Sequence, residues 1–131
     1  MSTAVQLDIA CLCADWCGTC REYTDTFAAL QQVLPGHRYR WIDIEDEADL
    51  VGDVDVETFP TLLVAAQGHV LFAGPVLPRL TDAQRLIEVQ QARATEALGS
   101  GQWPSAAAQG VPADQWAAFS AVASSLARND D

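Results

Sequence analysis

The chain has 131 residues, half of them hydrophobic, and charged residues make up 19% of it. This is the length of one domain with enough apolar material for a core, which excludes wholesale disorder. Eighteen acidic residues against seven basic ones, all seven of them arginine, give a net charge of -11. A chain this acidic is repelled by nucleic-acid phosphates and by anionic lipid surfaces.

Neither a membrane span nor a secretory signal is expected from the sequence. No apolar run approaches the roughly 18 residues that a spanning helix needs. The first eight residues lack a basic start, and Gln6 and Asp8 stand where a signal peptide is apolar. We therefore expect a cytoplasmic protein without nucleic-acid or membrane partners.

The first part of the chain predicts a strand, a helix and a second strand. The short apolar run 5–13 is typical of a buried strand, and residues 17–34 carry apolar side chains at helical spacing. Pro35 and Gly36 end this helix, and 39–44 forms the next strand. Strands joined by one helix through short connections make a parallel, right-handed unit.

The rest of the chain predicts a hairpin and two helices. Residues 43–57 contain eight acids, which indicate a solvated face with a short helix and could attract basic partners. Strands are predicted at 61–66 and 69–73, joined by a turn at Gln67 and Gly68. A helix follows from Thr81, its expected cap, to Leu98, with Gly99 as its stop. We divide the chain into a domain at 1–98, a linker at 99–112 and a C-terminal amphipathic helix within 113–131 that packs on the domain.

All four cysteines lie within ten residues, at positions 11, 13, 17 and 20. Such a cluster closes no long loop, so it indicates a local chemical site rather than a disulfide scaffold. A tetrahedral metal site would need all four sulfurs to converge from a strand and a helix start without a nearby histidine, so we expect no metal. His37 and His69 fall at turns, and neither is predicted to be catalytic.

The spacing of Cys17 and Cys20 favours redox chemistry. Cys17 is predicted at the first turn of a helix, where unpaired N–H groups and the positive dipole end favour a thiolate. Cys20, three residues later, shares its helical face. The expected chemistry is attack by Cys17 on a disulfide, a mixed disulfide, and release by Cys20.

Two segments resemble the thioredoxin family. The run Ala14-Asp-Trp-Cys-Gly-Thr-Cys20 resembles the family's active site, and Phe59-Pro60-Thr61 resembles its cis-proline loop. The resemblance covers roughly residues 4–98 and lacks the family's usual first strand and helix. It implies an α/β thioredoxin-like fold with a four-stranded mixed sheet flanked by helices, to which this chain adds its C-terminal helix.

The resemblance also implies a function. It makes the chain a thiol–disulfide oxidoreductase with catalytic Cys17 and Cys20, which reduces protein disulfides and needs no cofactor beyond the redox-active Cys17–Cys20 disulfide. Its partners would be protein disulfides and a reductase such as thioredoxin reductase or another dithiol donor. The substrate-binding residues that it implies are Trp16, Gly18, Thr19, Phe59, Pro60 and Gly74.

The chain departs from the family pattern at three positions. Thr19 stands in place of a proline, Cys11 in place of a buried aspartate, and Trp41 in place of its lysine partner. Cys11 and Cys13 share one face of a strand, where they are either a redox relay or two small buried hydrophobic residues. The lost acid–base pair favours an alternative function, a binding module or co-chaperone with weak redox turnover; the intact cysteine pair favours the enzyme.

Overall fold

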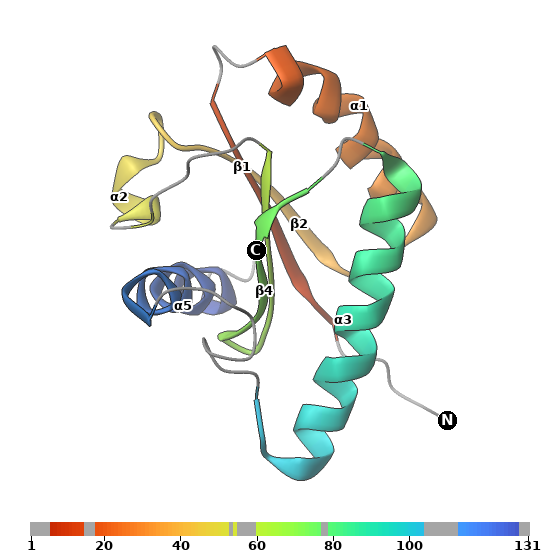
Figure 1. Cartoon of the computed structure of the whole chain (residues 1–131), viewed down its shortest axis with the longest axis vertical. Helices are drawn as coiled ribbons and strands as arrows, with labels where there is room; N and C mark the ends of the chain where they lie inside the picture. Colours follow the sequence, from red (N-terminus) through yellow and green to blue (C-terminus); the bar gives the residue numbers. More distant parts are fainter. Residues whose placement is uncertain are drawn as a thin grey trace.

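The computed structural model describes residues 6–14, 18–52, 54, 60–76, 79–103 and 113–128. In these residues a sheet lies between two layers of helices (Figure 1). The strands are β1 (Asp8–Cys13), β2 (Arg38–Asp43), β3 (Thr61–Ala66) and β4 (His69–Pro75). The helices are α1 (Gly18–Val33), α2 (Ala48–Val51), α3 (Leu80–Ser100) and α5 (Ala113–Arg128).

The sheet is mixed, with the strand order β2-β1-β3-β4. β1 and β2 are parallel and are connected through α1, whereas β3 is antiparallel to both β1 and β4. Gln67 and Gly68 have positive φ angles of 52° and 84°, which match the twist that a two-residue hairpin requires. The register pairs Leu12 with Thr61, so the carboxyl end of β1 meets the amino end of β3. The predicted four-stranded sheet is confirmed.

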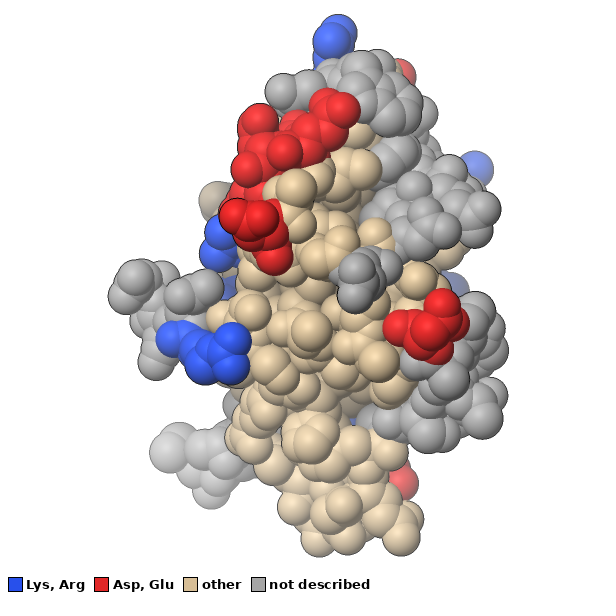
Figure 2. Space-filling model, turned by 90° about the vertical axis from the view of Figure 1, so that its left-hand side faces the viewer, with Lys and Arg blue, Asp and Glu red and all other residues tan. Residues whose placement is uncertain are grey.

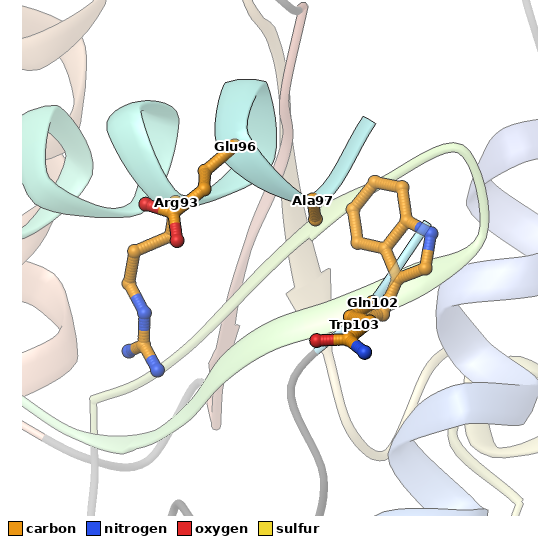
Figure 3. Close-up of a pocket in the computed structure, with 5 residues that line it drawn as sticks. All are labelled: Arg93, Glu96, Ala97, Gln102 and Trp103. Atoms are coloured by element: carbon orange, nitrogen blue, oxygen red, sulfur yellow. The ribbon is translucent and has the colours of Figure 1, made fainter. Parts of the chain in front are cut away.

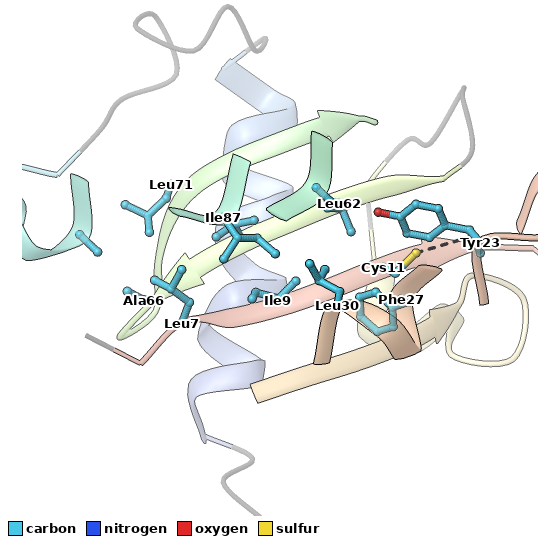
Figure 4. Packing of buried hydrophobic residues seen from close by; sticks show 14 of the residues in the cluster. Leu7, Ile9, Cys11, Tyr23, Phe27, Leu30, Leu62, Ala66, Leu71 and Ile87 are labelled. Atoms are coloured by element: carbon cyan, nitrogen blue, oxygen red, sulfur yellow. Dashed lines mark hydrogen bonds between the residues drawn. The ribbon is translucent and has the colours of Figure 1, made fainter. Parts of the chain in front are cut away.

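The pleat of the strands divides the core into two halves. Alternate side chains of β1 and β3 point to the face that α1 and α3 cover, where Ile9, Leu62, Phe27 and Ile87 are buried together (Figure 4). The cysteines of β1 lie on this same face. Because side chains alternate between the two faces along a strand, Cys11 and Cys13 lie on the same side of the sheet.

The opposite face is covered by α2 and α5. Ala10 and Leu12 of β1 pack there with Phe119, Val122 and other apolar residues of α5. Arg38 joins the end of this helix to the sheet, because its Nε lies 2.5 Å from the buried Asp8 carboxylate and its Nη2 donates to the Leu126 carbonyl at 3.0 Å. The C-terminal helix thus completes the second half of the core.

The ends of α3 differ from the prediction. The helix begins at Leu80 rather than after a Thr81 cap, and its N-cap Arg79 makes no side-chain capping bond. It continues through Gly99 to Ser100, because the left-handed residue that ends it is Gly101, whose N–H donates to the Ala97 carbonyl at 2.7 Å. No helix in the described ranges is both long and apolar enough to span a membrane.

Candidate active site

A disulfide joins the end of β1 to the first turn of α1. Cys13 is the last residue of the strand, and Cys20 is the third residue of the helix. Their sulfurs are bonded, with Cα atoms 5.8 Å apart, a separation typical of disulfides. Only 1% of Cys13 and 2% of Cys20 is exposed to solvent, so the bond lies inside the core.

This pairing differs from the predicted one. The family resemblance implies a Cys17–Cys20 disulfide, whereas the structure bonds Cys20 to Cys13. The reason is tertiary: α1 crosses the face of the sheet to which Cys13 points, so its first turn brings Cys20 against the end of β1. Cys17 itself lies outside the described residues. The spacing within the cysteine cluster carried no signal that would have identified Cys13 as this partner.

Cys11 is a free, buried thiol next to this disulfide. Its sulfur lies 3.8 Å from that of Cys13, and because the bonded Cys13 carries no proton, Cys11 is the donor of this weak hydrogen bond. Burial raises the pKa of Cys11 to about 12, so it remains a thiol at neutral pH. In the sheet it stands between Trp41 of β2 and Leu62 of β3.

A buried hydroxyl lies in the same part of the core. The side chain of Tyr23, one turn after Cys20, is fully buried and its oxygen has no hydrogen-bond partner. Its pKa is raised, first by burial and then by the charge that Cys11 would carry. Tyr23 is one of the apolar residues of the predicted helix 17–34, and its position three residues after Cys20 predicts that it is a partly core residue near the site.

The structure describes only some of the predicted substrate-binding residues. Trp16 and Phe59 lie outside the described residues, as does the side chain of Thr19. Gly18 begins α1 and is exposed, with open space where a Cβ would stand. Pro60 is buried directly before β3, and its carbonyl accepts the Val76 N–H at 3.2 Å.

Gly74 lies on β4 opposite Leu62 of β3. A Cβ on Gly74 would stand 3.4 Å from the ring of Phe72, which is an ordinary van der Waals contact. The carboxyl end of β1, the amino end of β3 and the carboxyl end of β4 share one end of the sheet. The structure therefore brings Pro60 and Gly74 to the end of the sheet where Cys13 meets Cys20.

The described part of the acidic run, from Asp43 to Asp49, has exposed or half-buried acids beside α2 (Figure 2). Several of these acids hold the local structure. The carboxylate of Asp43 accepts the N–H groups of Glu45 at 2.9 Å and Asp46 at 3.1 Å, and Glu47 forms an ion pair with Arg40.

A separate hollow lies beside the carboxyl end of α3. It has a volume of about 300 Å³ and is lined by Arg93, Glu96, Ala97, Gln102 and Trp103 (Figure 3). Trp103 stacks on His69, with ring centroids 4.2 Å apart. His69 starts β4, so this hollow is at the end of that strand opposite Pro75 and the cysteines. Among the described residues, its lining includes no cysteine or serine.

The comparisons with known proteins agree with this fold. Residues 5–77, more than half of the chain, match the family model of thioredoxin. A mutant thioredoxin from Halobacterium salinarum NRC-1 is 24% identical and aligns over 66% of this chain and 76% of its own, with a TM-score of 0.58. The thioredoxin of Fasciola hepatica is 20% identical over 66% of this chain and 83% of its own, with a TM-score of 0.59. Mitochondrial thioredoxin 3 of Saccharomyces cerevisiae, in its oxidised form, is 20% identical over 65% and 79%, with a TM-score of 0.57.

The comparison with curated proteins gives no match. At identities below 25%, the solved structures support the fold, and the family model supports the membership. The sheet order, the α1 connection between β1 and β2, and Cys20 at the start of that helix are consistent with both. The chain therefore belongs to the thioredoxin family.

Proposed function

We propose that this protein is a thiol–disulfide oxidoreductase that reduces protein disulfides through a cycle of Cys17 and Cys20. The observation that carries the proposal is the sulfur of Cys20, which is bonded in a disulfide at the start of α1. A sulfur held there by a rigid helix is positioned for exchange with a second sulfur near the same turn. Membership of the thioredoxin family supports this function.

The proposed cycle starts with both cysteines reduced. The Cys17 thiolate attacks one sulfur of a substrate disulfide, and the other substrate sulfur leaves as a thiolate. Cys20 then loses its proton and attacks the Cys17 sulfur, which releases the second substrate thiol and forms a Cys17–Cys20 disulfide. The substrate is reduced, the protein dithiol is oxidised, and an external dithiol or a reductase such as thioredoxin reductase restores it.

The residues around the cysteines have proposed roles in this cycle. Trp16, Gly18, Thr19, Phe59, Pro60 and Gly74 would form the groove that binds the substrate chain. The exposed Gly18 leaves open space at the helix start, which supports close approach of a substrate backbone. We propose that residues 1–98 carry the activity, that the predicted linker 99–112 starts after α3 ends at Ser100 and leads to the C-terminal helix in 113–131, and that the protein acts in the cytoplasm.

The structure also offers an observation in favour of the binding module. While Cys20 is bonded to Cys13, it cannot resolve a mixed disulfide. A protein that kept this bond permanently would bind partners through the fold but would turn over weakly. Turnover of the reduced protein separates the two functions.

The test is the reduction of insulin by dithiothreitol, started with the fully reduced protein and followed by turbidity. We expect the wild type to accelerate the reaction and Cys17→Ser to lose that acceleration, because the attacking thiolate is gone. The control is Val33→Ser, a substitution at the far end of α1 where the side chain is 44% exposed, which should keep the wild-type rate. If neither the wild type nor Cys17→Ser accelerates insulin reduction, the proposed oxidoreductase function is overturned and the binding module is supported.

A further inference from the structure

The Cys13–Cys20 disulfide has no access to a dissolved reductant. Both residues are almost completely buried, and they belong to the apolar cluster between the sheet, α1 and α3. Thiol–disulfide exchange requires a thiolate to approach a sulfur directly, so a bulky external thiol cannot attack this bond in the folded protein. Electrons must reach it through a thiol of the same chain.

Cys11 is the nearest described thiol, but it is a poor nucleophile. Its sulfur lies 3.8 Å from that of Cys13. With a pKa of about 12, only about one molecule in 100,000 carries the Cys11 thiolate at pH 7. Its proton instead points to the Cys13 sulfur, where the S–H group can stabilise negative charge when that sulfur leaves. Cys11 is therefore a positioning residue for Cys13 and not the attacking group.

Cys17 is the remaining cysteine and has the required place in the sequence. It directly precedes α1, which begins at Gly18, and it stands three residues before Cys20. Residues three apart at a helix start share a face, and the exposed helix end favours a thiolate.

We infer that Cys13 is a second, internal partner of Cys20, which exchanges with Cys17 to hold the oxidised protein as a buried Cys13–Cys20 disulfide. This inference rests on the proposed Cys17–Cys20 cycle and adds a state to it. From the sequence, Cys13 is predicted as a relay residue or a small core residue. In this inference, Cys13 displaces Cys17 from Cys20, so that the disulfide becomes buried.

The exchange conserves the number of disulfides. Starting from Cys17–Cys20, Cys13 loses its proton and attacks the Cys20 sulfur; the Cys13–Cys20 bond forms, the Cys17–Cys20 bond breaks, and Cys17 leaves as a thiolate. No external oxidant is consumed. In reverse, the Cys17 thiolate attacks Cys20, and the Cys13 sulfur departs with the Cys11 S–H as its hydrogen-bond donor before it is protonated.

The buried state has a functional consequence. Cys17 is free to attack a substrate, but Cys20 is engaged and cannot release the mixed disulfide. Turnover therefore stops until the internal disulfide returns to Cys17 and is reduced from outside. The exchange makes Cys13–Cys20 a latent oxidised form of the enzyme.

The two disulfides can be separated by proteolysis before aspartate. Cleavage at Asp8, Asp15 and Asp25 gives the peptide 8–14, with Cys11 and Cys13, and the peptide 15–24, with Cys17 and Cys20. The wild-type protein is oxidised with one equivalent of oxidised dithiothreitol, its free thiols are alkylated at acid pH, and the digest is analysed by mass spectrometry without reduction. We expect the two peptides to be linked and Cys17 to be alkylated in most molecules.

Three variants assign the link. Cys13→Ser should abolish it and leave a closed loop within 15–24, whereas the matched control Cys11→Ser should keep it. Cys17→Ser should lose most of it when the folded protein is oxidised, because the buried Cys13 and Cys20 are reached only through Cys17; a link as abundant as in the wild type would overturn the exchange. Since the decisive result comes from the wild type, it does not depend on whether Cys13→Ser folds.

If the wild type contains only the disulfide within peptide 15–24, the internal exchange is overturned. It is also overturned if the link between the two peptides survives in Cys13→Ser but disappears in Cys11→Ser, because the link would then involve Cys11. These failures are distinct from failure of the proposed function. A protein that reduces insulin but never links the two peptides retains the Cys17–Cys20 cycle without the internal state. A protein that links the peptides but does not accelerate insulin reduction loses the function and with it the latent form.

Discussion

The two faces of the sheet have the same kind of core but different chemistry. The face under α1 and α3 holds Cys11, the Cys13–Cys20 disulfide and the unpaired Tyr23 hydroxyl. The face under α2 and α5 is formed by alanine, aliphatic and aromatic side chains, and no cysteine belongs to its cluster. The difference shows how a strand period of two separates reactive side chains from those that only stabilise the fold. Substitutions on the two faces should therefore affect different properties.

The largest stability effect is expected on the face without sulfur. Phe119 of α5 is 6% exposed and packs with the sheet residues of that cluster. Phe119→Ala should lower the free energy of unfolding by about 3–5 kcal/mol, because it removes a buried ring and leaves a cavity. Urea denaturation measures this loss, and insulin reduction per folded molecule should stay at the wild-type value.

The control for this substitution is Leu98→Ala on α3, where the side chain is 46% exposed. It should change stability by no more than about 0.5 kcal/mol. A fall in specific turnover of Phe119→Ala at full folding would mean that the two faces are coupled, and the comparison would fail.

The next effect concerns the disulfide on the reactive face. In Cys17→Ser, a Cys13–Cys20 disulfide formed by oxidation of the unfolded chain before refolding should raise the free energy of unfolding by about 2–3 kcal/mol, because a cross-link over seven residues restricts the unfolded chain. The measurement is urea denaturation of the oxidised and reduced forms. The double variant Cys13→Ser/Cys17→Ser should show no such redox dependence; an equal rise in both proteins would exclude this disulfide as its cause.

A smaller effect distinguishes two tyrosines near the reactive face. Tyr23→Phe should leave stability unchanged or raise it by about 1 kcal/mol, because the buried hydroxyl that it removes has no partner. Tyr39→Phe should cost about 1 kcal/mol, since the Tyr39 hydroxyl donates to the Leu34 carbonyl at 2.6 Å. Chemical denaturation of the two variants side by side tests this order, and a loss in Tyr23→Phe as large as that in Tyr39→Phe would contradict it.

The smallest effect is a pH dependence at the edge of the reactive face. His37 accepts the Leu7 N–H at its Nδ1 atom at 3.1 Å, and burial lowers its pKa, partly offset by a hydrogen bond with Gln91. The unfolded chain, with a histidine pKa near about 6.5, then binds more protons than the folded protein. This contribution to stability is fully present above about pH 6.5 and decreases as the pH falls toward the lowered pKa of the folded state.

Thermal unfolding between about pH 7.5 and pH 5.5 measures this dependence. His37→Gln should show a shallower fall of the melting temperature than the wild type, because the titrating ring has been removed. Val33→Ser, which replaces an exposed side chain that does not titrate, is the control and should keep the wild-type slope. Identical slopes in His37→Gln and the wild type would show that another group titrates.

Most of the fold followed from local patterns in the sequence. Hydrophobic periodicity predicted β1, α1, β2, β3, β4 and α5 as elements. An element that buries one face has apolar residues at regular spacing, and one that buries both faces has a continuous apolar run. The ends of α3 were less predictable. Gly99 and Gly101 both offer a helix stop, and only the bond from Gly101 to Ala97 decides between them.

The site was predictable only in part. The Cys17-x-x-Cys20 spacing predicted a redox site around the start of α1, where the structure places Cys20. The sequence also determined that Cys11 and Cys13 share a face, because residues two apart in a strand always do. Which sulfurs are bonded depends on the angle at which α1 crosses the sheet, a long-range property that sequence spacing does not contain. Tertiary structure alone therefore placed Cys20 against Cys13, left Cys11 as a buried thiol, and brought the hydroxyl of Tyr23 into the same apolar core.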